Sequence, residues 1–184
     1  DILADASAVG NGTDFATYVV CTGFRPLNAG EYTSTLTTSP AAANLRLTGN
    51  ETFMTNQVGT LTLAAGGGLT AMTAGSTFNL GSLGLLAHTG NTGLTGGQIN
   101  AAGSLVIVHT LGDLNVSSVF TGTNGLNKGG AGALNLNTAQ YLSGTYTVNN
   151  GILKLNSGAD NTLVVIPTAT VPTTPGLTVN GGTV

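Results

Sequence analysis

The amino-acid sequence predicts an all-β fold, a right-handed parallel β-helix, from three observations. First, only 6% of the 184 residues are charged and 41% are hydrophobic, whereas a disordered chain would combine low hydrophobicity with high charge. Second, Thr, Val and Leu favour pleated strands, and the abundant Gly and Asn favour turns that need positive φ. Third, short phrases that begin with glycine recur along the chain, which is typical of a solenoid.

The recurring phrase is Gly-x-Leu-x-Leu, a turn glycine followed by a strand with one apolar face. Its copies begin at Gly59, Gly132 and Gly151, and a variant with Ile107 in place of the second leucine begins at Gly103. A longer phrase at 148–153, Val-Asn-Asn-Gly-Ile-Leu, aligns with Val-Asn-Gly-Gly-Thr-Val at 179–184. These spacings suit a repeating unit of roughly 20 to 30 residues. Asn-Gly pairs in the same region are also typical of hairpin turns, so an antiparallel β-sandwich is the alternative fold.

The apolar positions of these phrases predict the interior. We expect aliphatic side chains to stack from one coil to the next, and Thr and Asn to form hydrogen-bonded ladders outside. The predicted interior residues are Leu61, Leu63, Leu105, Ile107, Leu134, Leu136, Val148, Leu153 and Leu155.

We expect one continuous solenoid segment of a longer repeat protein. Residues 1–45 hold most of the aromatic and charged side chains and predict irregular β rungs with a loop excursion, and 46–184 predict regular rungs. Prolines in 156–176 predict a loop that carries one apolar strand at 163–166. No polar or helical cap is recognisable at either end, and residues 1–2 placed after Val184 complete the repeated phrase. Both features predict units that stack end to end.

The segment 125–158 closely resembles the autotransporter-associated β-strand repeat, also called the passenger-associated transport repeat. The matching residues are Gly125, Leu126, Lys128, Gly132, Leu134, Leu136, Tyr141, Gly144, Thr145, Val148, Asn149, Gly151, Leu153 and Leu155. Gly130 and Leu142 depart from the pattern, and 24–32 and 105–118 resemble its flanks. The resemblance implies an exported passenger-type β-helix that is displayed on the bacterial cell surface.

The few ionisable and sulfur-containing residues limit the possible partners. The formal net charge is −3, and the four basic residues are scattered, so no nucleic-acid surface is predicted. No apolar run approaches the roughly 18 residues that a membrane-spanning segment needs. Cys21 is the single cysteine, which leaves a buried apolar role or an intermolecular disulfide.

We predict no catalytic, cofactor-binding or metal-binding residue. The seven carboxylates occur at no repeated offset, and none lies beside a basic residue on a strand, whereas glycosidase-type chemistry needs paired carboxylates. His88 and His109 lack zinc-site spacing and predict strand-end or surface positions. Asp113 and Asp160 predict turns.

These observations predict an extracellular structural stalk or fibre segment rather than an enzyme. Its expected partners are further copies or repeats of itself, stacked end to end. An adhesin is the alternative function, with Tyr18, Phe24, Arg25 and Tyr32 forming a patch that binds glycan or a cell surface. A polysaccharide-degrading enzyme is less favoured because no carboxylate cluster is recognisable.

Overall fold

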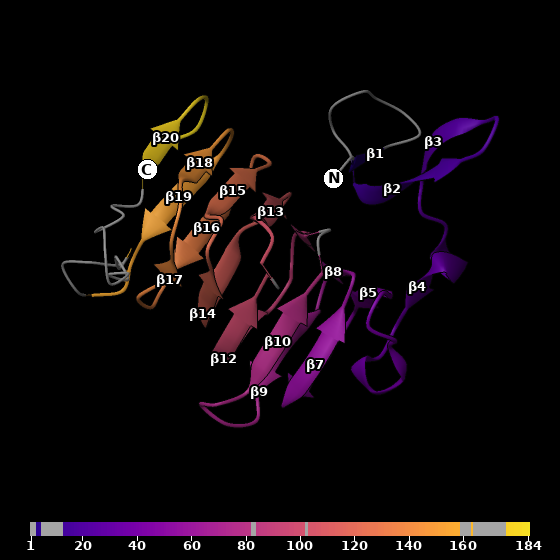
Figure 1. Cartoon of the computed structure of the whole chain (residues 1–184), viewed down its shortest axis with the longest axis horizontal. Coiled ribbons are helices and arrows are strands. Elements are labelled where there is room, and N and C mark those ends of the chain that lie inside the picture. The colour runs from indigo at the N-terminus through magenta and orange to yellow at the C-terminus, as the bar shows by residue number, and fades with distance from the viewer. Residues whose placement is uncertain (1–2, 5–12, 82–83, 102, 159–162, 164–175) are drawn as a thin grey trace.

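The computed structural model describes residues 3–4, 13–81, 84–101, 103–158, 163 and 176–184, which form a β-solenoid (Figure 1). Its two main sheets contain nine and eight strands, and every pairing within them is parallel. The predicted all-β parallel fold is therefore confirmed, and the antiparallel sandwich is excluded. No helix in the described residues is long and apolar enough to cross a membrane.

The strands lie on three faces of the coil. The eight-stranded sheet forms the first face and comprises β4 (Tyr32–Thr33), β5 (Asn44–Leu47), β8 (Thr60–Leu63), β11 (Leu85–Ala87), β13 (Val106–Thr110), β15 (Leu126–Gly129), β18 (Tyr146–Val148) and β20 (Leu177–Val179).

The nine-stranded sheet covers the other two faces, because its two long strands bend around the corner between them. These strands are β12 (Gly93–Asn100) and β14 (Leu114–Gly122). The second face holds their first halves together with β6 (Asn50–Phe53), β9 (Gly68–Ala71), β16 (Ala133–Leu136) and β19 (Ile152–Leu155). The third face holds their second halves together with β7 (Thr55–Val58), β10 (Thr77–Leu80) and β17 (Tyr141–Leu142).

The core is a set of side-chain rows that run along the solenoid axis. One inner row of the first face pairs successive coils in register: Leu45, Leu61, Leu85, Val108, Lys128, Val148 and Val179. An inner row of the third face is aromatic and aliphatic, with Phe78, Ile99 and Phe120 in register. These three side chains are 0–1% exposed. Burying each large apolar side chain contributes about 1.5–3 kcal/mol, and the repetition stabilises the rod without disulfides.

Polar ladders accompany the apolar rows, as the sequence predicts. The amide of Asn149 donates to Asn127, and Asn180 donates in turn to Asn149, at 2.7 and 2.8 Å. On the second face Asn135 donates to Asn115 at 2.9 Å. The aligned phrases at 148–153 and 179–184 lie directly above one another, since Val148 pairs with Val179 and Ile152 with Thr183.

Six of the nine predicted interior residues are buried, and three are not. Leu105 is 36% exposed and Ile107 is half-buried, whereas Val106 and Val108 point inward. A turn closed by the Ser104 N–H and the Ala101 carbonyl separates Gly103 from the strand, so the alternation starts one residue later than predicted. Leu155 occupies an inner row above Leu136 but is 40% exposed, because no described coil covers it.

An antiparallel unit precedes the solenoid. It comprises β1 (Leu3–Ala4), β2 (Asp14–Val19) and β3 (Gly23–Pro26), in the order β1-β2-β3, and is followed by the short 3₁₀ turns η1 (Ala29–Glu31) and η2 (Leu36–Thr38). Figure 1 shows β2 and β3 beyond β4, at the opposite end of the molecule from β20. The predicted strand at 163–166 lies outside the described residues except for Leu163, which bridges to Gln140. Asp160 and residues 1–2 also lie outside them.

Candidate functional site: the N-terminal arm

The β2–β3 hairpin, called the arm here, projects from the start of the solenoid. Its turn is closed by the Thr22 N–H, which donates to the Val19 carbonyl at 3.0 Å. Cys21 occupies this turn at φ 67°, a left-handed conformation that is uncommon for a residue other than glycine. The Cys21 side chain is exposed. The predicted buried role is therefore wrong, because a tight hairpin turn directs its residues into solvent.

The arm displays an aromatic pair. Tyr18 and Phe24 are cross-strand partners, and their ring centroids lie 5.3 Å apart in an edge-to-face arrangement. They are 59% and 64% exposed, and Val20 beside them is 75% exposed. Cross-strand aromatic pairs of this geometry stabilise a hairpin while leaving apolar area open to a partner.

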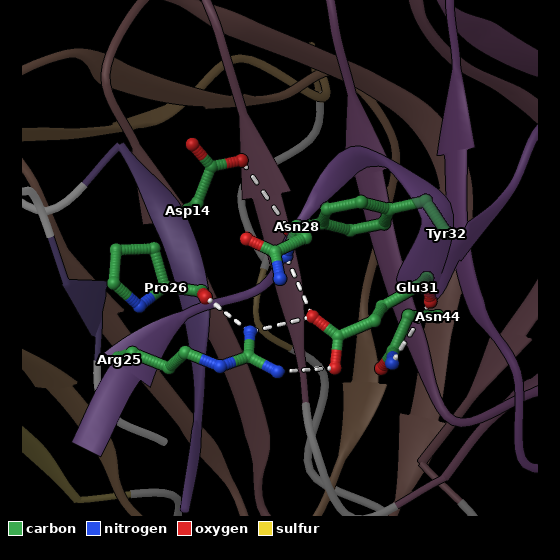
Figure 2. A network of polar contacts seen from close by, with 7 residues as sticks. All are labelled: Asp14, Arg25, Pro26, Asn28, Glu31, Tyr32 and Asn44. Atoms are coloured by element: carbon green, nitrogen blue, oxygen red, sulfur yellow. Dashed lines mark hydrogen bonds and ion pairs between the residues drawn. The ribbon is translucent and has the colours of Figure 1, made fainter. Parts of the chain in front are cut away.

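Arg25 follows Phe24 in β3, so its side chain lies on the opposite side of the hairpin. Figure 2 shows that it reaches Glu31 at the base of the arm. Its guanidinium donates to both carboxylate oxygens of Glu31, at 2.6 and 2.8 Å, and to the Pro26 carbonyl at 2.8 Å. The Glu31 carboxylate also accepts the Asn28 N–H at 2.7 Å. The hydrogen bond from Arg25, then that from Asn28, lowers the pKa of Glu31 to about 2. This bidentate pair fixes the chain where it leaves the arm.

A second ion pair ties the arm to the solenoid. Arg46 on β5 donates to the Asp14 carboxylate of β2 at 2.7 Å, and the Tyr32 hydroxyl donates to the same oxygen at 3.3 Å. The Arg46 guanidinium lies 5.5 Å from the centre of the Tyr32 ring, within cation–π range. Burial, with a smaller effect of Asp14, raises the pKa of Tyr32 to about 12, so its hydroxyl stays protonated as a donor.

His88 completes this attachment on the solenoid side, one residue beyond β11. Burial lowers the pKa of His88, and the nearby positive charge of Arg46 lowers it further, while Asp14 and a hydrogen bond with the Thr13 backbone oppose these effects. Its Nε2 atom is buried and has no hydrogen-bond partner in the described part of the chain. The neutral imidazole is therefore the form that suits the attached arm.

The structure divides the predicted patch of Tyr18, Phe24, Arg25 and Tyr32 into two pairs. Tyr18 and Phe24 lie together on the exposed arm. Arg25 and Tyr32 belong instead to the ion-paired network that holds the arm (Figure 2). The sequence reveals no carboxylate beside a base, yet folding pairs Glu31 with Arg25 and Asp14 with Arg46. Both carboxylates are thereby engaged in attachment.

Sequence reasoning missed the burial of Lys128. This side chain is 0% exposed and occupies an inner row between Val108 and Val148. Its ammonium group donates to the carbonyls of Gly129, Gly130 and Asn150 at 2.9, 2.6 and 3.0 Å. Burial lowers the pKa of Lys128 to about 8, against an opposing effect of Asp113. The signal was present in the alternation Leu126-Asn127-Lys128, which places Lys128 on the same side as Leu126.

The remaining polar candidates have structural positions. The Asp113 carboxylate accepts the Ala133 N–H at 2.9 Å and so links two turns. His109, predicted at a strand end or on the surface, is the penultimate residue of β13 and is half-buried. Among the described residues, no group of three or more His, Cys, Asp or Glu side chains is arranged to hold a metal ion.

A scan against protein-family models, a search of curated proteins and a search of solved structures each find no match to this chain. The strand topology shows a β-solenoid. The resemblance to the autotransporter-associated repeat depends only on the sequence motif at 125–158.

Proposed function

We propose that this chain is a structural solenoid segment of a bacterial surface protein of the autotransporter type, acting outside the cell as part of a stalk or fibre and not as an enzyme. The observation that carries the proposal is the exposure of the two apolar rows at β20. Leu177 and Val179 continue inner rows of the first face, yet each is 46% exposed. The preceding members are at most 2% exposed, from Leu45 to Val148 in the row of Val179 and from Val106 to Tyr146 in the row of Leu177. The edge of β20 therefore presents both backbone and apolar side chains to a further coil.

The regular interior supports a mechanical role. Aliphatic and aromatic rows, with amide ladders outside, give successive coils similar contacts with their neighbours. A rod of this kind gains length and stiffness by adding coils, because stability grows with each nearest-neighbour interface. The further coils would come from additional repeats or from another copy.

Sedimentation velocity of the 184-residue chain tests the open coil directly. We expect concentration-dependent self-association, because two uncovered apolar rows can cover one another. Val179→Glu, which places a charge in the open row, abolishes the association. Thr178→Glu, which places the same charge on the neighbouring outward-facing side chain, leaves it in place. A wild-type chain that stays monomeric, or a Val179→Glu variant that associates like the wild type, contradicts the proposal.

An adhesin is the second candidate, and the arm is the observation that favours it. Tyr18, Val20 and Phe24 expose apolar surface on a projecting hairpin whose base is fixed by two ion pairs. Rigid aromatic anchors of this kind are typical of binding hot spots.

Binding of the chain to bacterial and host cell surfaces tests the adhesin function. The paired variant Tyr18→Ala/Phe24→Ala removes the apolar surface and is expected to lose binding. Thr22→Ala, at the exposed turn of the same hairpin, serves as the control and retains it. Equal binding by both variants excludes the arm as the adhesive surface.

A further inference from the structure

A groove lies at the corner between the second and third faces, away from both the arm and the open coil. It has a volume of about 510 Å³, within the range of ligand-binding pockets. The loop from Met72 to Ala74 lines one side, Gly96 and Gly97 lie between, and Ser117 and Val119 line the other side. The groove therefore spans three successive coils.

The glycine pair creates the depression. Gly96 and Gly97 have φ of +70° and +61°, a left-handed conformation that side-chain-bearing residues rarely adopt. A Cβ atom on Gly97 would lie 2.7 Å from the Ser76 carbonyl oxygen and 2.8 Å from the Ala71 Cβ. The sharp bend of β12 thus excludes side chains at these two positions, while the preceding coil carries a longer loop at the same corner. The hollow is a consequence of the backbone path.

Hydrogen bonds hold the groove in shape. The Ser76 hydroxyl accepts the Thr73 N–H at 3.0 Å, and the Ser76 N–H donates to the Thr73 carbonyl at 3.1 Å, so the loop is a closed turn. The buried Ser118 hydroxyl donates to the Gly96 carbonyl at 2.6 Å and fixes the glycine bend to the next coil. A pre-formed site of this kind loses little conformational entropy on binding.

The groove is chemically neutral. None of the residues that line it is charged. The Gln98 amide and the Ser117 hydroxyl are on exposed residues, and within the described part of the chain neither makes a hydrogen bond to another protein group. Met72 and Val119 add apolar surface on opposite sides. A charged ligand would meet no counter-charge here, whereas a ligand that alternates hydroxyl and C–H groups matches both kinds of lining.

The third face extends this neutral surface along the axis. Its outer row is in register from coil to coil and carries only amide, hydroxyl and phenol groups: Gln57, Asn79, Asn100, Thr121 and Tyr141. Parallel strands repeat about every 4.8 Å, so an extended polymer lying along the axis would meet similar groups at each step. The aromatic ring of Tyr141 is 42% exposed at one end of the row.

We propose that this groove and the adjoining third face bind a neutral polysaccharide. The sugar hydroxyls hydrogen-bond the Gln98 amide and the Ser117 hydroxyl, and the C–H faces of the rings pack on Met72 and Val119. Neutrality distinguishes this surface from the ion-paired base of the arm. The proposal is independent of the stalk function, because the groove is complete without the open coil.

Isothermal titration of the whole chain with cellohexaose, a soluble galactomannan and polygalacturonate tests the proposal. We expect measurable binding of at least one neutral glycan and none of the acidic polymer. Ser117→Arg, which fills the groove from an exposed position, lowers the affinity at least tenfold, and Gln98→Ala lowers it several-fold. Thr178→Arg, the same added side chain on the first face, leaves the affinity unchanged.

Four outcomes would overturn the proposal. The first is the absence of neutral-glycan binding at millimolar concentration, and the second is equal binding of polygalacturonate. The third is a Ser117→Arg variant that binds like the wild type. The fourth is loss of binding in Phe24→Ala, which would move the site to the arm. Amide hydrogen exchange of β12 and β14 verifies that each variant keeps the native fold, so unchanged exchange with lost binding supports the groove.

Discussion

The two ends of the solenoid differ although they are built from the same rows of side chains. One inner row of the second face runs Glu51, Leu69, Leu94, Val116, Leu136 and Leu155. At the N-terminal end this row begins with a carboxylate, which accepts the Leu36 N–H of η2 at 2.6 Å. At the C-terminal end it finishes with a leucine that is 40% exposed.

The N-terminal end is therefore closed and the C-terminal end is open. Leu36 is 5% exposed and packs into the core beside the first coil, where Leu45 and Phe53 are 0% and 1% exposed. The sequence predicted no cap at either end, and this prediction is wrong for the N-terminal end. The cap went unrecognised because it consists of a single 3₁₀ turn and one inward carboxylate. The two ends of the described solenoid therefore differ in how much apolar surface they leave uncovered.

The largest expected effect compares equal truncations at the two ends. Leu45→Ala removes a fully buried side chain in the first complete coil and is expected to lower the free energy of unfolding by about 2–5 kcal/mol. Leu177→Ala, in the open coil, costs far less because that leucine is already 46% exposed. Urea denaturation of both variants measures the difference. Equal decreases in the free energy of unfolding for the two variants would show that the open coil is covered in solution.

The cap itself is tested by replacing its acceptor. Glu51→Ala leaves the Leu36 N–H without its partner and is expected to cost about 1–3 kcal/mol, with faster hydrogen exchange confined to the first coils. Glu51→Gln retains an acceptor oxygen and serves as the matched control, with a smaller loss. Wild-type exchange rates in Glu51→Ala would mean that η2 does not depend on this carboxylate.

Lys128 provides the contrasting charged group within an inner row, far from the closed end. Its pKa of about 8 lies below the ordinary value of 10.5, so the folded chain binds fewer protons between these pH values than the unfolded chain. Stability should therefore rise by about 1–3 kcal/mol from pH 8 to 10.5 relative to Lys128→Met. Denaturation curves at several pH values measure this slope. If the wild type and Lys128→Met show the same dependence of stability on pH, that dependence comes from groups other than Lys128.

The attachment of the arm to the closed end is expected to be weak. Asp14→Asn removes the ion pair with Arg46, which is partly exposed, and should cost about 0.2–1 kcal/mol. Hydrogen exchange in β2 and β3 should accelerate while exchange in β8 and β11 stays unchanged. If exchange in β8 and β11 also accelerated, the arm would contribute to the stability of the solenoid core, which contradicts this prediction.

The smallest effect is a pH dependence confined to the arm. His88 has a lowered pKa when the arm is attached, so attachment should weaken as the pH falls below the ordinary histidine value of 6.5. Glu31, with a pKa of about 2, contributes above its ordinary value of 4.5 and loses this contribution as the pH falls toward 2. Hydrogen exchange of the arm amides, measured below pH 6.5 and between pH 4.5 and 2, follows the loss of attachment in each pH range. His88→Gln should remove the upper step and Glu31→Gln the lower one; persistence of either step in its variant contradicts the assignment.

The prediction of the interior succeeded where the repeated phrase coincided with a strand start. Gly132 and Gly151 each precede a strand whose leucines at positions 134 and 153 point inward. The phrase at Gly103 follows the same apolar pattern, with Ile107 in place of the second leucine, but a turn intervenes and the inward side chains shift by one residue. The copies also lie on different faces, since β8 belongs to the first face while β16 and β19 belong to the second. The repeated sequence motif alone does not determine which face of the solenoid a strand joins.

The arm was predicted only in part for a similar reason. Its composition identified Tyr18, Phe24, Arg25 and Tyr32 as unusual in a chain with few aromatic and charged residues. Which of them face solvent depended on their partners in the fold, as with Tyr32, whose hydroxyl donates to Asp14 18 residues away. The glycine groove gave no signal in the sequence, because two adjacent glycines also occur in ordinary turns.

The sequence by itself determined the all-β class, the stacking of coils and most of the aliphatic rows, because alternation and turn residues act over a few neighbouring positions. Tertiary structure alone decided which end is closed, which charges pair, and where a groove opens. Most of these features depend on contacts between residues 15 to 32 positions apart, as in Leu36 with Glu51 and Asp14 with Arg46. The pair of Arg25 and Glu31, six positions apart, is the more local case. Such contacts form only when coils of unequal length are stacked in register.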